Sequence, residues 1–282
     1  MENSIPYGKQ LIDKDDINSV IEVLKSDWIT QGPKVEEFEN SISRYCNSKY
    51  AVAVNSATSA LHIACRALEL KSGDILWTSP NSFVASANCG LYCDSIIDFV
   101  DIDPLTYNMS IDKLEKKLIN AESSNSLPKV IIPVHFAGQS CDMQRLHSLS
   151  KKYNFKILED ASHALGASYK DYKVGSCKYS DITVFSFHPV KIITTGEGGV
   201  ATTNSSILQK RMTLFRSHGI TKENIRSSSD VGAWSYEQID LGYNYRLSDI
   251  NAALGCSQIK KIDEFVKKRN SIAQKYNIEF ID

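Results

Sequence analysis

The sequence predicts an α/β protein with a mostly parallel central sheet that is covered by helices on both faces. Short apolar or β-branched runs recur along the chain, and segments with helical periodicity fall between several of them. This alternation is typical of a sheet whose strands are connected by helices. Because such sheets bind ligands at the carboxyl ends of their strands, the residues that follow each expected strand are the candidate functional residues.

The individual elements can be placed from this pattern. The expected strands cover residues 50–54, 74–78, 95–100, 129–134, 155–158, 182–187 and 199–203. The clearest expected helices cover residues 58–70, 142–153 and 262–277. Two polar stretches, residues 120–129 and 226–235, predict exposed loops.

Length, charge and cysteine usage limit the possible classes of protein. With 282 residues the chain can form one large domain and part of a second, and its net charge of −1 gives no electrostatic basis for binding nucleic acid or an anionic membrane. No apolar run reaches the roughly 18 residues that span a bilayer, and the start "MENSIPYGKQ" has no signal-peptide pattern. The seven scattered cysteines include no CxxC pair, which predicts reduced thiols in a cytoplasmic protein and no metal site.

Two strand ends predict groups that could hold an anion and a planar ring. Small residues at 55–60 open a helix directly after a strand, and free N–H groups at a helix N-terminus suit a phosphate. A simple Ser/Thr helix cap would give the same pattern. After the next strand, Phe83 follows in a turn, where an aromatic residue is usually part of the core.

Two further strand ends carry charged residues in apolar surroundings. Glu159 and Asp160 end a strand that is expected to be buried, where a carboxylate is costly without a cationic partner, although a helix-capping aspartate is the alternative. Lys191 follows the strand at 182–187 among apolar and threonine neighbours. A lysine is normally a solvated surface charge, but desolvation here would lower its pKa and make the amine nucleophilic.

Together these groups predict pyridoxal 5'-phosphate as a cofactor. Its aldehyde requires an amine, its ring nitrogen requires an anion, and its phosphate requires oriented donors. The glycines at 196, 198 and 199 then allow the backbone to turn tightly into the next strand beside the cofactor, where side chains would crowd it.

Several segments in this order resemble the sugar aminotransferases of the DegT/DnrJ/EryC1/StrS family. They are "NSATSAL" (55–61), "SPNSFVASAN" (79–88), "EDASHALGA" (159–167), "SFHPVKIITTGEGG" (186–199), "FRSHG" (215–219) and "GYNYRLSDINAALG" (242–255). The resemblance implies a fold-type I pyridoxal-phosphate transferase with a cofactor-binding large domain at 1–257. Residues 258–282 are expected to be a linking helix and the start of a C-terminal small domain that is largely absent. The apolar side chains of that helix around Ile259, Ile262 and Phe265 are expected to be exposed.

The resemblance also assigns roles to individual residues at the cofactor. Lys191 matches the Schiff-base lysine and Asp160 the partner of the pyridinium nitrogen, so both are the expected catalytic residues. His163 matches the residue near the phenolic oxygen, and Phe83 matches the aromatic residue stacked on the ring. The expected phosphate-binding residues are Ala57, Thr58 and Ser186.

Other matched positions imply a shared site and a substrate-lining segment. Asn244 matches the residue that reaches the cofactor phosphate of the neighbouring subunit, with Arg246 beside it, so a homodimer with shared active sites is expected. The positions that match the lining of the sugar-nucleotide site are Tyr7, Asp27, Trp28, Ile29 and Thr30.

Within the family, "NSATSAL" (55–61), "WITQG" (28–32) and "ASHALG" (161–166) are most similar to the pseudaminic acid branch. The implied reaction is pyridoxal-phosphate-dependent amination of a UDP-linked 4-keto-6-deoxy-N-acetyl hexose, with glutamate as amino donor. Amination of another nucleotide-linked keto sugar and a cofactor-binding chain without turnover remain open. A related dehydratase would use the same cofactor, but that branch has histidine at the position of Lys191.

Overall fold

The computed structural model describes residues 6, 8–221 and 235–280. Within this part, seven strands form one sheet in the order β1-β9-β8-β5-β4-β2-β3. β9 pairs antiparallel with β1 and β8, and the other pairings in the sheet are parallel. The prediction of a mostly parallel sheet is therefore confirmed. The strands are β1 (Tyr50–Val54), β2 (Ile75–Thr78), β3 (Ile96–Phe99), β4 (Val130–Ile132), β5 (Lys156–Asp160), β8 (Ile182–Ser186) and β9 (Gly199–Thr203).

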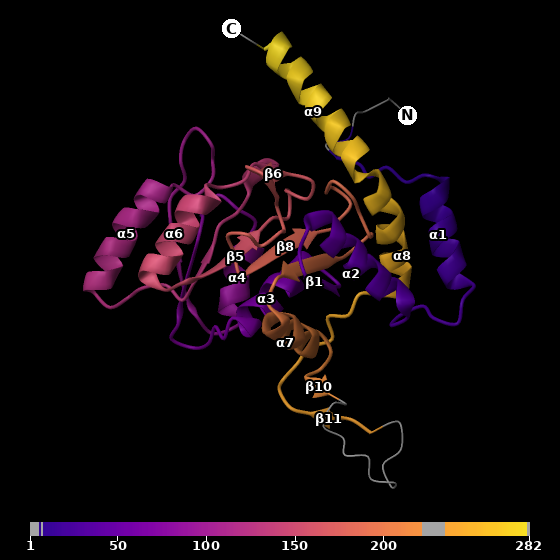
Figure 1. Cartoon of the computed structure of the whole chain (residues 1–282), viewed down its shortest axis with the longest axis horizontal. Coiled ribbons are helices and arrows are strands. Elements are labelled where there is room, and N and C mark those ends of the chain that lie inside the picture. The colour runs from indigo at the N-terminus through magenta and orange to yellow at the C-terminus, as the bar shows by residue number, and fades with distance from the viewer. Residues whose placement is uncertain (1–5, 7, 222–234, 281–282) are drawn as a thin grey trace.

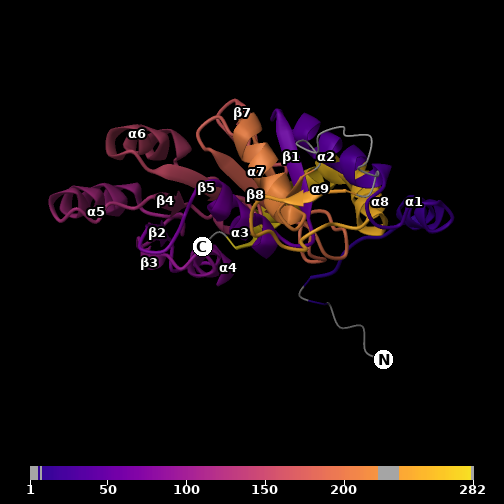
Figure 2. The same cartoon turned by 90° about the horizontal axis from the view of Figure 1, so that it is seen from below.

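Helices connect these strands and cover both faces of the sheet. They are α1 (Lys14–Leu24), α2 (Pro33–Cys46), α3 (Ala57–Ala67), α4 (Ala85–Leu91), α5 (Ile111–Ser123), η1 (Phe136–Gly138), α6 (Met143–Tyr153), α7 (Ser206–Arg216), α8 (Asp249–Gln258), η2 (Ile259–Lys261) and α9 (Ile262–Glu279). Two small hairpins complete the described part, β6 (Ser168–Tyr169) with β7 (Tyr172–Lys173) and β10 (Ile220–Thr221) with β11 (Glu237–Gln238). Figure 2 shows α5 and α6 at one end of the sheet, with α1 and α8 at the other.

Three apolar clusters hold the helices against the sheet. One fills the space under α3, α4 and α7, a second lies under α2 and α8, and a third lies under α5 and α6. Side chains alternate across a strand, so β8 contributes Ile182 and Val184 to the first cluster and Phe185 to the second. Burying each such side chain contributes about 1.5–3 kcal/mol, which makes both faces of the central strands apolar.

Short polar side chains fix where several helices begin. Ser56 caps α3, and the other helices with a serine or aspartate cap of this kind are α1, α5, α6, α7 and α8. In each case the side-chain oxygen accepts a hydrogen bond from a backbone N–H of the first turn, which stabilises the helix by about 1 kcal/mol. The first turn of α3 therefore begins directly after β1, at the edge where ligands bind in sheets of this type.

Two sequence predictions about loops have different outcomes. The prediction of a loop over residues 120–129 is wrong at its start, because α5 continues to Ser123 and Ala121 is buried against the third cluster. The residues around Ala121 are polar, so the sequence pattern did not indicate that Ala121 is buried. Of the second predicted loop, 226–235, all but one residue lie outside the described residues.

The segment after α8 also differs from the prediction. Ile259 and Ile262 are only 8% and 1% exposed, and both belong to the cluster under α2 and α8. Phe265 packs on the same cluster, so the predicted exposed apolar face is wrong at these positions. Further along, α9 runs away from the sheet and exposes Ile272 and Tyr276 (Figure 1). None of the helices in the described ranges is long and apolar enough to cross a membrane.

Candidate active site

A cavity of about 860 Å³ opens at the carboxyl ends of the strands. It is lined by the start of α3 and by residues that follow β2, β4, β5 and β8. The predicted site residues that line this cavity are Ala57, Thr58, Phe83, Asp160, His163, Ser186 and Lys191. The structure thus brings together side chains and backbone from four parts of the sequence.

One end of the cavity is formed by the N-terminus of α3. Ser56 Oγ accepts a hydrogen bond of 3.1 Å from the N–H of Ser59, which leaves the N–H groups of Ala57 and Thr58 at positions without an intrahelical acceptor. Ser56 can therefore cap α3 while the N–H groups of Ala57 and Thr58 remain available to an anion. Ser186 at the end of β8 pairs with Gly199, and a Cβ at Gly199 would lie 2.5 Å from the Ala57 nitrogen. Glycine at this position allows β9 to pass against the start of α3.

Asp160 is a buried carboxylate whose two oxygens both accept hydrogen bonds. The residue is 5% exposed. Ser86 Oγ on α4 donates to Oδ2 at 2.6 Å, and Ser162 donates to Oδ1 through its hydroxyl at 2.7 Å and its N–H at 3.2 Å. The alternative of a helix cap is wrong, because no helix begins after Asp160. The carboxylate instead faces the cavity from the end of β5.

Lys191 lies in the turn between β8 and β9 and is half-buried in the cavity wall. Its N–H donates to the His188 carbonyl at 2.9 Å, which forms part of the turn. Burial lowers the pKa of the Lys191 ammonium, and the negative charge of Asp160 opposes this shift. A lower pKa increases the fraction of neutral, nucleophilic amine. Gly196 has φ of +80°, a conformation that glycine adopts without strain, so the turn requires this residue.

Phe83 and His163 complete the cavity wall. Phe83 is 75% exposed, so the expectation of a core aromatic is wrong and the ring is available to a ligand. The pKa of His163 is lowered, mainly because the ring is partly buried and also because the cation of Lys191 is nearby. The negative charge of Asp160 opposes this shift. A neutral imidazole can both accept and donate a hydrogen bond at the cavity.

The predicted substrate-lining segment does not line this cavity. Asp27, Trp28, Ile29 and Thr30 are exposed between α1 and α2, and the Thr30 carbonyl accepts from the N–H of Asp249 at 2.9 Å. Tyr7 lies outside the described residues. The proposed contacts of these residues with a sugar nucleotide stay a prediction.

Asn244 and Arg246 are also separate from the cavity of their own chain. Asn244 is exposed and forms a backbone bridge with Ser217. Arg246 lines another hollow, of about 250 Å³, together with Arg216 and Glu39. A role of Asn244 in the site of a second subunit is compatible with its exposure and stays a prediction.

Sequence reasoning missed the residues that support Asp160. Ser86 and Ser162 both donate to its carboxylate, and buried His135 lines the cavity after β4. The proximity of Ser162, two residues after Asp160, was a signal that could have been used, because such hydroxyls often bond a nearby carboxylate. The contact with Ser86 spans 74 residues and depends on the packing of α4 against the sheet.

Comparison with known proteins identifies the family of this chain. The model of the DegT/DnrJ/EryC1/StrS aminotransferase family matches residues 10–282. The chain belongs to this family. The sugar aminotransferases of the family are the proteins to which the sequence motifs pointed.

Several relatives are similar over nearly the whole chain. A Campylobacter jejuni protein (strain 81-176) named UDP-4-amino-4,6-dideoxy-N-acetyl-beta-L-altrosamine transaminase is 43% identical over 276 residues, which are 98% of this chain and 69% of the relative. The Bacillus subtilis spore coat polysaccharide biosynthesis protein SpsC is 38% identical over the same shares of 98% and 69%.

Solved structures of sugar aminotransferases superpose closely on this fold. Helicobacter pylori PseC, an aminotransferase involved in pseudaminic acid biosynthesis, matches with a TM-score of 0.91 and 37% identity over 99% of this chain and 71% of its own. Spr1654 from Streptococcus pneumoniae, solved in a PLP-form, matches with a TM-score of 0.85 and 32% identity over 98% of this chain and 71% of its own.

Proposed function

We propose that this chain is a pyridoxal-phosphate-dependent 4-aminotransferase. It transfers the amino group of glutamate to a UDP-linked 4-keto-6-deoxy-N-acetyl hexose in pseudaminic acid biosynthesis. The observation that carries the proposal is the placement of Lys191, Asp160 and the start of α3 around one cavity. The names of the Campylobacter jejuni and Helicobacter pylori relatives support the substrate class.

The cavity fits the three chemical requirements of pyridoxal phosphate. The half-buried amine of Lys191 suits an aldehyde, and the buried carboxylate of Asp160 suits a protonated ring nitrogen. The N–H groups of Ala57 and Thr58, with the Ser186 hydroxyl, suit a phosphate. A Cβ at Gly199 would displace this cradle, which shows how closely the backbone is fitted there.

Each residue then has a distinct chemical role. Pyridoxal phosphate, when bound, supplies an electron-withdrawing ring that stabilises negative charge on the substrate carbon. Lys191 holds the cofactor between reactions, and its released Nζ moves the proton at the carbon that gains or loses the amino group. Asp160 would hold the ring nitrogen through its carboxylate, Phe83 would pack on the ring, and His163 would lie near the phenolic oxygen.

The surface beside the cavity supports a dimer with shared sites. Phe83, Val84, Leu91 and Tyr92 are between 51% and 75% exposed, and all belong to α4 or its immediate flanks. Of these four side chains Phe83 also lines the cavity, and exposed apolar side chains grouped on one short helix favour a protein partner. We assign this surface to a second copy of the chain, whose Asn244 would reach the phosphate.

We also propose a cytoplasmic location. All seven cysteines are free and buried in the described structure. Unpaired thiols are the rule in reducing compartments, whereas extracellular proteins of comparable cysteine content usually pair them.

The proposal is tested by the colour and reactivity of the purified protein. Addition of pyridoxal phosphate should produce a yellow protein, and borohydride should fix the cofactor covalently to Lys191. Lys191→Ala should abolish amino transfer and covalent fixation while the circular dichroism spectrum stays unchanged. Asp160→Asn should weaken cofactor binding by about 1.5–3 kcal/mol and reduce the rate further. Full turnover by Lys191→Ala would refute the proposal.

A further inference from the structure

A row of buried polar side chains crosses the sheet on the face opposite to the Asp160 side chain. Glu159 pairs in register with Thr183, and Thr183 pairs with Thr202, so the three side chains lie side by side across β5, β8 and β9. Glu159 is 5% exposed and the two threonines are 0% exposed. The row separates the apolar cluster under α2 and α8 from the one under α5 and α6.

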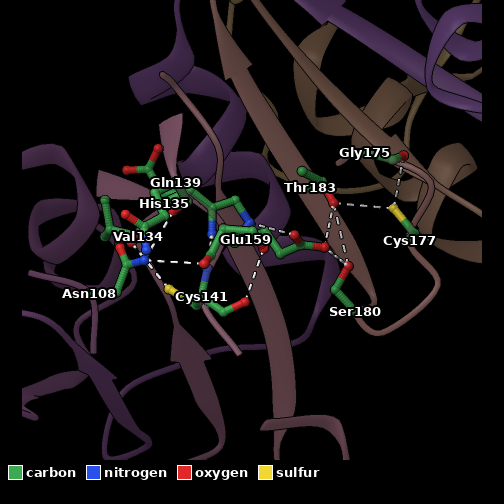
Figure 3. Close-up of polar contacts among 12 residues, drawn as sticks. Asn108, Val134, His135, Gln139, Cys141, Glu159, Gly175, Cys177, Ser180 and Thr183 are labelled. Carbon is green, nitrogen blue, oxygen red and sulfur yellow. Dashed lines mark hydrogen bonds and ion pairs between the residues drawn. The ribbon is translucent and has the colours of Figure 1, made fainter. Parts of the chain in front are cut away.

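The carboxylate of Glu159 is hydrogen-bonded on both oxygens. His135 Nε2 donates to Oε2 at 2.7 Å, while Thr183 Oγ1 donates to Oε1 at 2.8 Å and Ser180 Oγ donates to the same oxygen. Figure 3 shows Glu159 between His135 on one side and Thr183 with Ser180 on the other. Burial alone would raise the pKa of Glu159, but these donors outweigh burial and lower it.

The second ring nitrogen of His135 also has a hydrogen-bond partner. The N–H of Cys141 donates to His135 Nδ1 at 3.2 Å (Figure 3). Because Nδ1 accepts, the proton of the neutral ring lies on Nε2, where it is donated to Glu159. His135 Nε2 therefore donates to an ionised carboxylate, and every ring nitrogen and carboxylate oxygen is in a hydrogen bond. Burial disfavours the charged imidazole, but the hydrogen bonds with Cys141 and Glu159 outweigh burial and raise the pKa of His135 to about 10.

This network connects the strands that carry the active site. The backbone N–H of His135 donates to the Asp160 carbonyl at 3.0 Å, and the Asp160 N–H donates to the Pro133 carbonyl at 3.0 Å. Glu159 is thus bonded through His135 to the segment that pairs with Asp160, and through Thr183 to β8, which leads to Lys191. Three segments converge on one carboxylate, one residue away from Asp160.

A neighbouring set of bonds fixes the loop 134–141. Asn108 Oδ1 accepts from the N–H of Phe136 at 2.9 Å, and its Nδ2 donates to the Gln139 carbonyl at 3.0 Å. A Cβ at Gly138 would lie 2.8 Å from the carbonyl oxygen of His163, so the loop passes directly against the backbone of a cavity residue. Phe136 itself lines the cavity. Movement of this loop would therefore be transmitted to the site.

We propose that Glu159 is a positioning residue of the active site, which acts with His135 from the far face of the sheet. Its carboxylate holds the end of β5 and the loop 134–141 so that Asp160 and Phe136 face the cofactor. An apolar residue could fill the same space, but it could not bond three segments in one defined geometry. The inference rests on the proposed function for its link with the cofactor, whereas its effect on the backbone can be measured without one.

The test compares Glu159→Gln with Asp16→Asn. Asp16 is a matched control, because it is 0% exposed, accepts from Gln258 at 2.7 Å and pairs with Lys261 at 2.8 Å, on α1. In the cofactor-free protein, hydrogen exchange of residues 134–141 and 158–162 should be at least about tenfold faster in Glu159→Gln. Binding of pyridoxal phosphate should be about tenfold weaker and its visible band altered. Asp16→Asn should stay within about twofold of wild type in these measurements, even if it melts earlier.

The outcomes separate the inference from the proposed function. If Glu159→Gln melts earlier but matches Asp16→Asn in local exchange, cofactor affinity and spectrum, Glu159 only stabilises the core and the inference is wrong. If Glu159→Gln does not fold, Thr183→Val and Ser180→Ala each remove one donor, and unchanged exchange of 158–162 in both overturns it. Faster local exchange in a protein whose wild type binds no pyridoxal phosphate would support positioning and refute the proposed function.

Discussion

Ser86 Oγ donates a 2.6 Å hydrogen bond to Oδ2 of Asp160, and this bond joins α4 to the end of β5. Ser82 Oγ lies 2.9 Å from Ser86 Oγ, so a chain of hydroxyl groups leads from the cavity wall to the carboxylate. Buried charges require such donors, because an unsatisfied carboxylate would be expensive or would become protonated. Ser86 therefore satisfies one oxygen of the buried Asp160 carboxylate.

The first prediction concerns this bond. Ser86→Ala should weaken binding of pyridoxal phosphate by about tenfold, the lower end of the range for a hydrogen bond to a charged group. Ser95→Ala is a matched control, because Ser95 is 5% exposed, against 1% for Ser86, and its hydroxyl donates to the Gly90 carbonyl at 2.8 Å. Cofactor titration followed by absorbance measures both variants. Equal affinity of the two variants would show that Ser162 alone supports Asp160.

The second prediction concerns the close approach of β9 to α3. In Gly199→Ala the new Cβ would lie 2.5 Å from the Ala57 nitrogen and from the Ser56 carbonyl carbon, so the start of α3 must shift. We expect at least about a tenfold loss of affinity for pyridoxal phosphate, together with a lower melting temperature. Gly73→Ala is the control, since its φ of +85° strains the backbone although no atom lies within 4 Å of the new Cβ. If Gly199→Ala is less stable but binds pyridoxal phosphate as tightly as wild type, the start of α3 is not part of the cofactor site.

The third prediction uses the pKa of Lys191 in the cofactor-free protein. Burial lowers this pKa below the value of 10.5 that lysine has in the unfolded chain, with Asp160 opposing. The unfolded chain therefore binds the proton more tightly, and the lysine destabilises the fold below its folded pKa. Lys191→Met should be more stable than wild type at pH 7, by less than about 1 kcal/mol because solvent screens the half-exposed amine.

The gain from Lys191→Met should shrink as the pH rises towards 10.5, where both states lose the proton. Urea unfolding at pH 7 and pH 10 measures this difference in the free energy of unfolding between Lys191→Met and wild type. Lys116→Met on the exposed surface of α5 serves as the control and should show no such pH-dependent gain. A constant gain across this range would mean that methionine stabilises by packing and that the amine carries no cost.

The elements that the sequence predicted best are those with strong local signals. The strands at 50–54 and 199–203 match β1 and β9 residue for residue, because both are apolar and end at polar or glycine residues. Asp160 and Lys191 could be predicted because a charge beside a buried strand is unusual in any fold.

The residues that were missed depend on contacts between distant segments. Ser86 resembles any helical serine until α4 packs on the sheet and brings it to Asp160. The partners of Glu159 come from the loop after β4, from β8 and from the segment before β8, so they meet only in the folded protein. Ile259 and Ile262 were expected to be exposed because the small domain that would cover them was expected to be largely absent. They instead belong to the cluster under α2 and α8, whose other members are remote in sequence.

The fourth prediction concerns acid stability. His62 on α3 is 4% exposed, and burial, followed by the charge of Arg66, lowers its pKa to about 4. The folded protein therefore resists protonation of the ring, so stability should fall as the pH drops from 6.5 towards 4. His62→Gln should remove up to about 3 kcal/mol of this pH dependence.

Chemical unfolding at several pH values measures the contribution of His62. Tyr245→Phe is the control, because it removes the 3.1 Å contact between Tyr245 Oη and His62 Nδ1 and keeps the imidazole. This variant should lose some stability at every pH and retain the slope between pH 6.5 and 4. An unchanged slope in His62→Gln would assign the acid sensitivity to other groups.

The last prediction concerns the shared active site. If Asn244 of one subunit serves the cavity that contains Lys191 of the other, each of the variants Lys191→Ala and Asn244→Ala should be impaired alone. After mixing and subunit exchange, half of the dimers are hybrids, and each hybrid contains one cavity with both Lys191 and Asn244 intact. Amino transfer from glutamate to the UDP-linked keto sugar should therefore recover to about a quarter of the wild-type rate. A mixture of Lys191→Ala with Lys191→Met should not recover, because no dimer then contains the lysine. Failure of the first mixture, with exchange demonstrated by mass spectrometry, would place each site within a single chain.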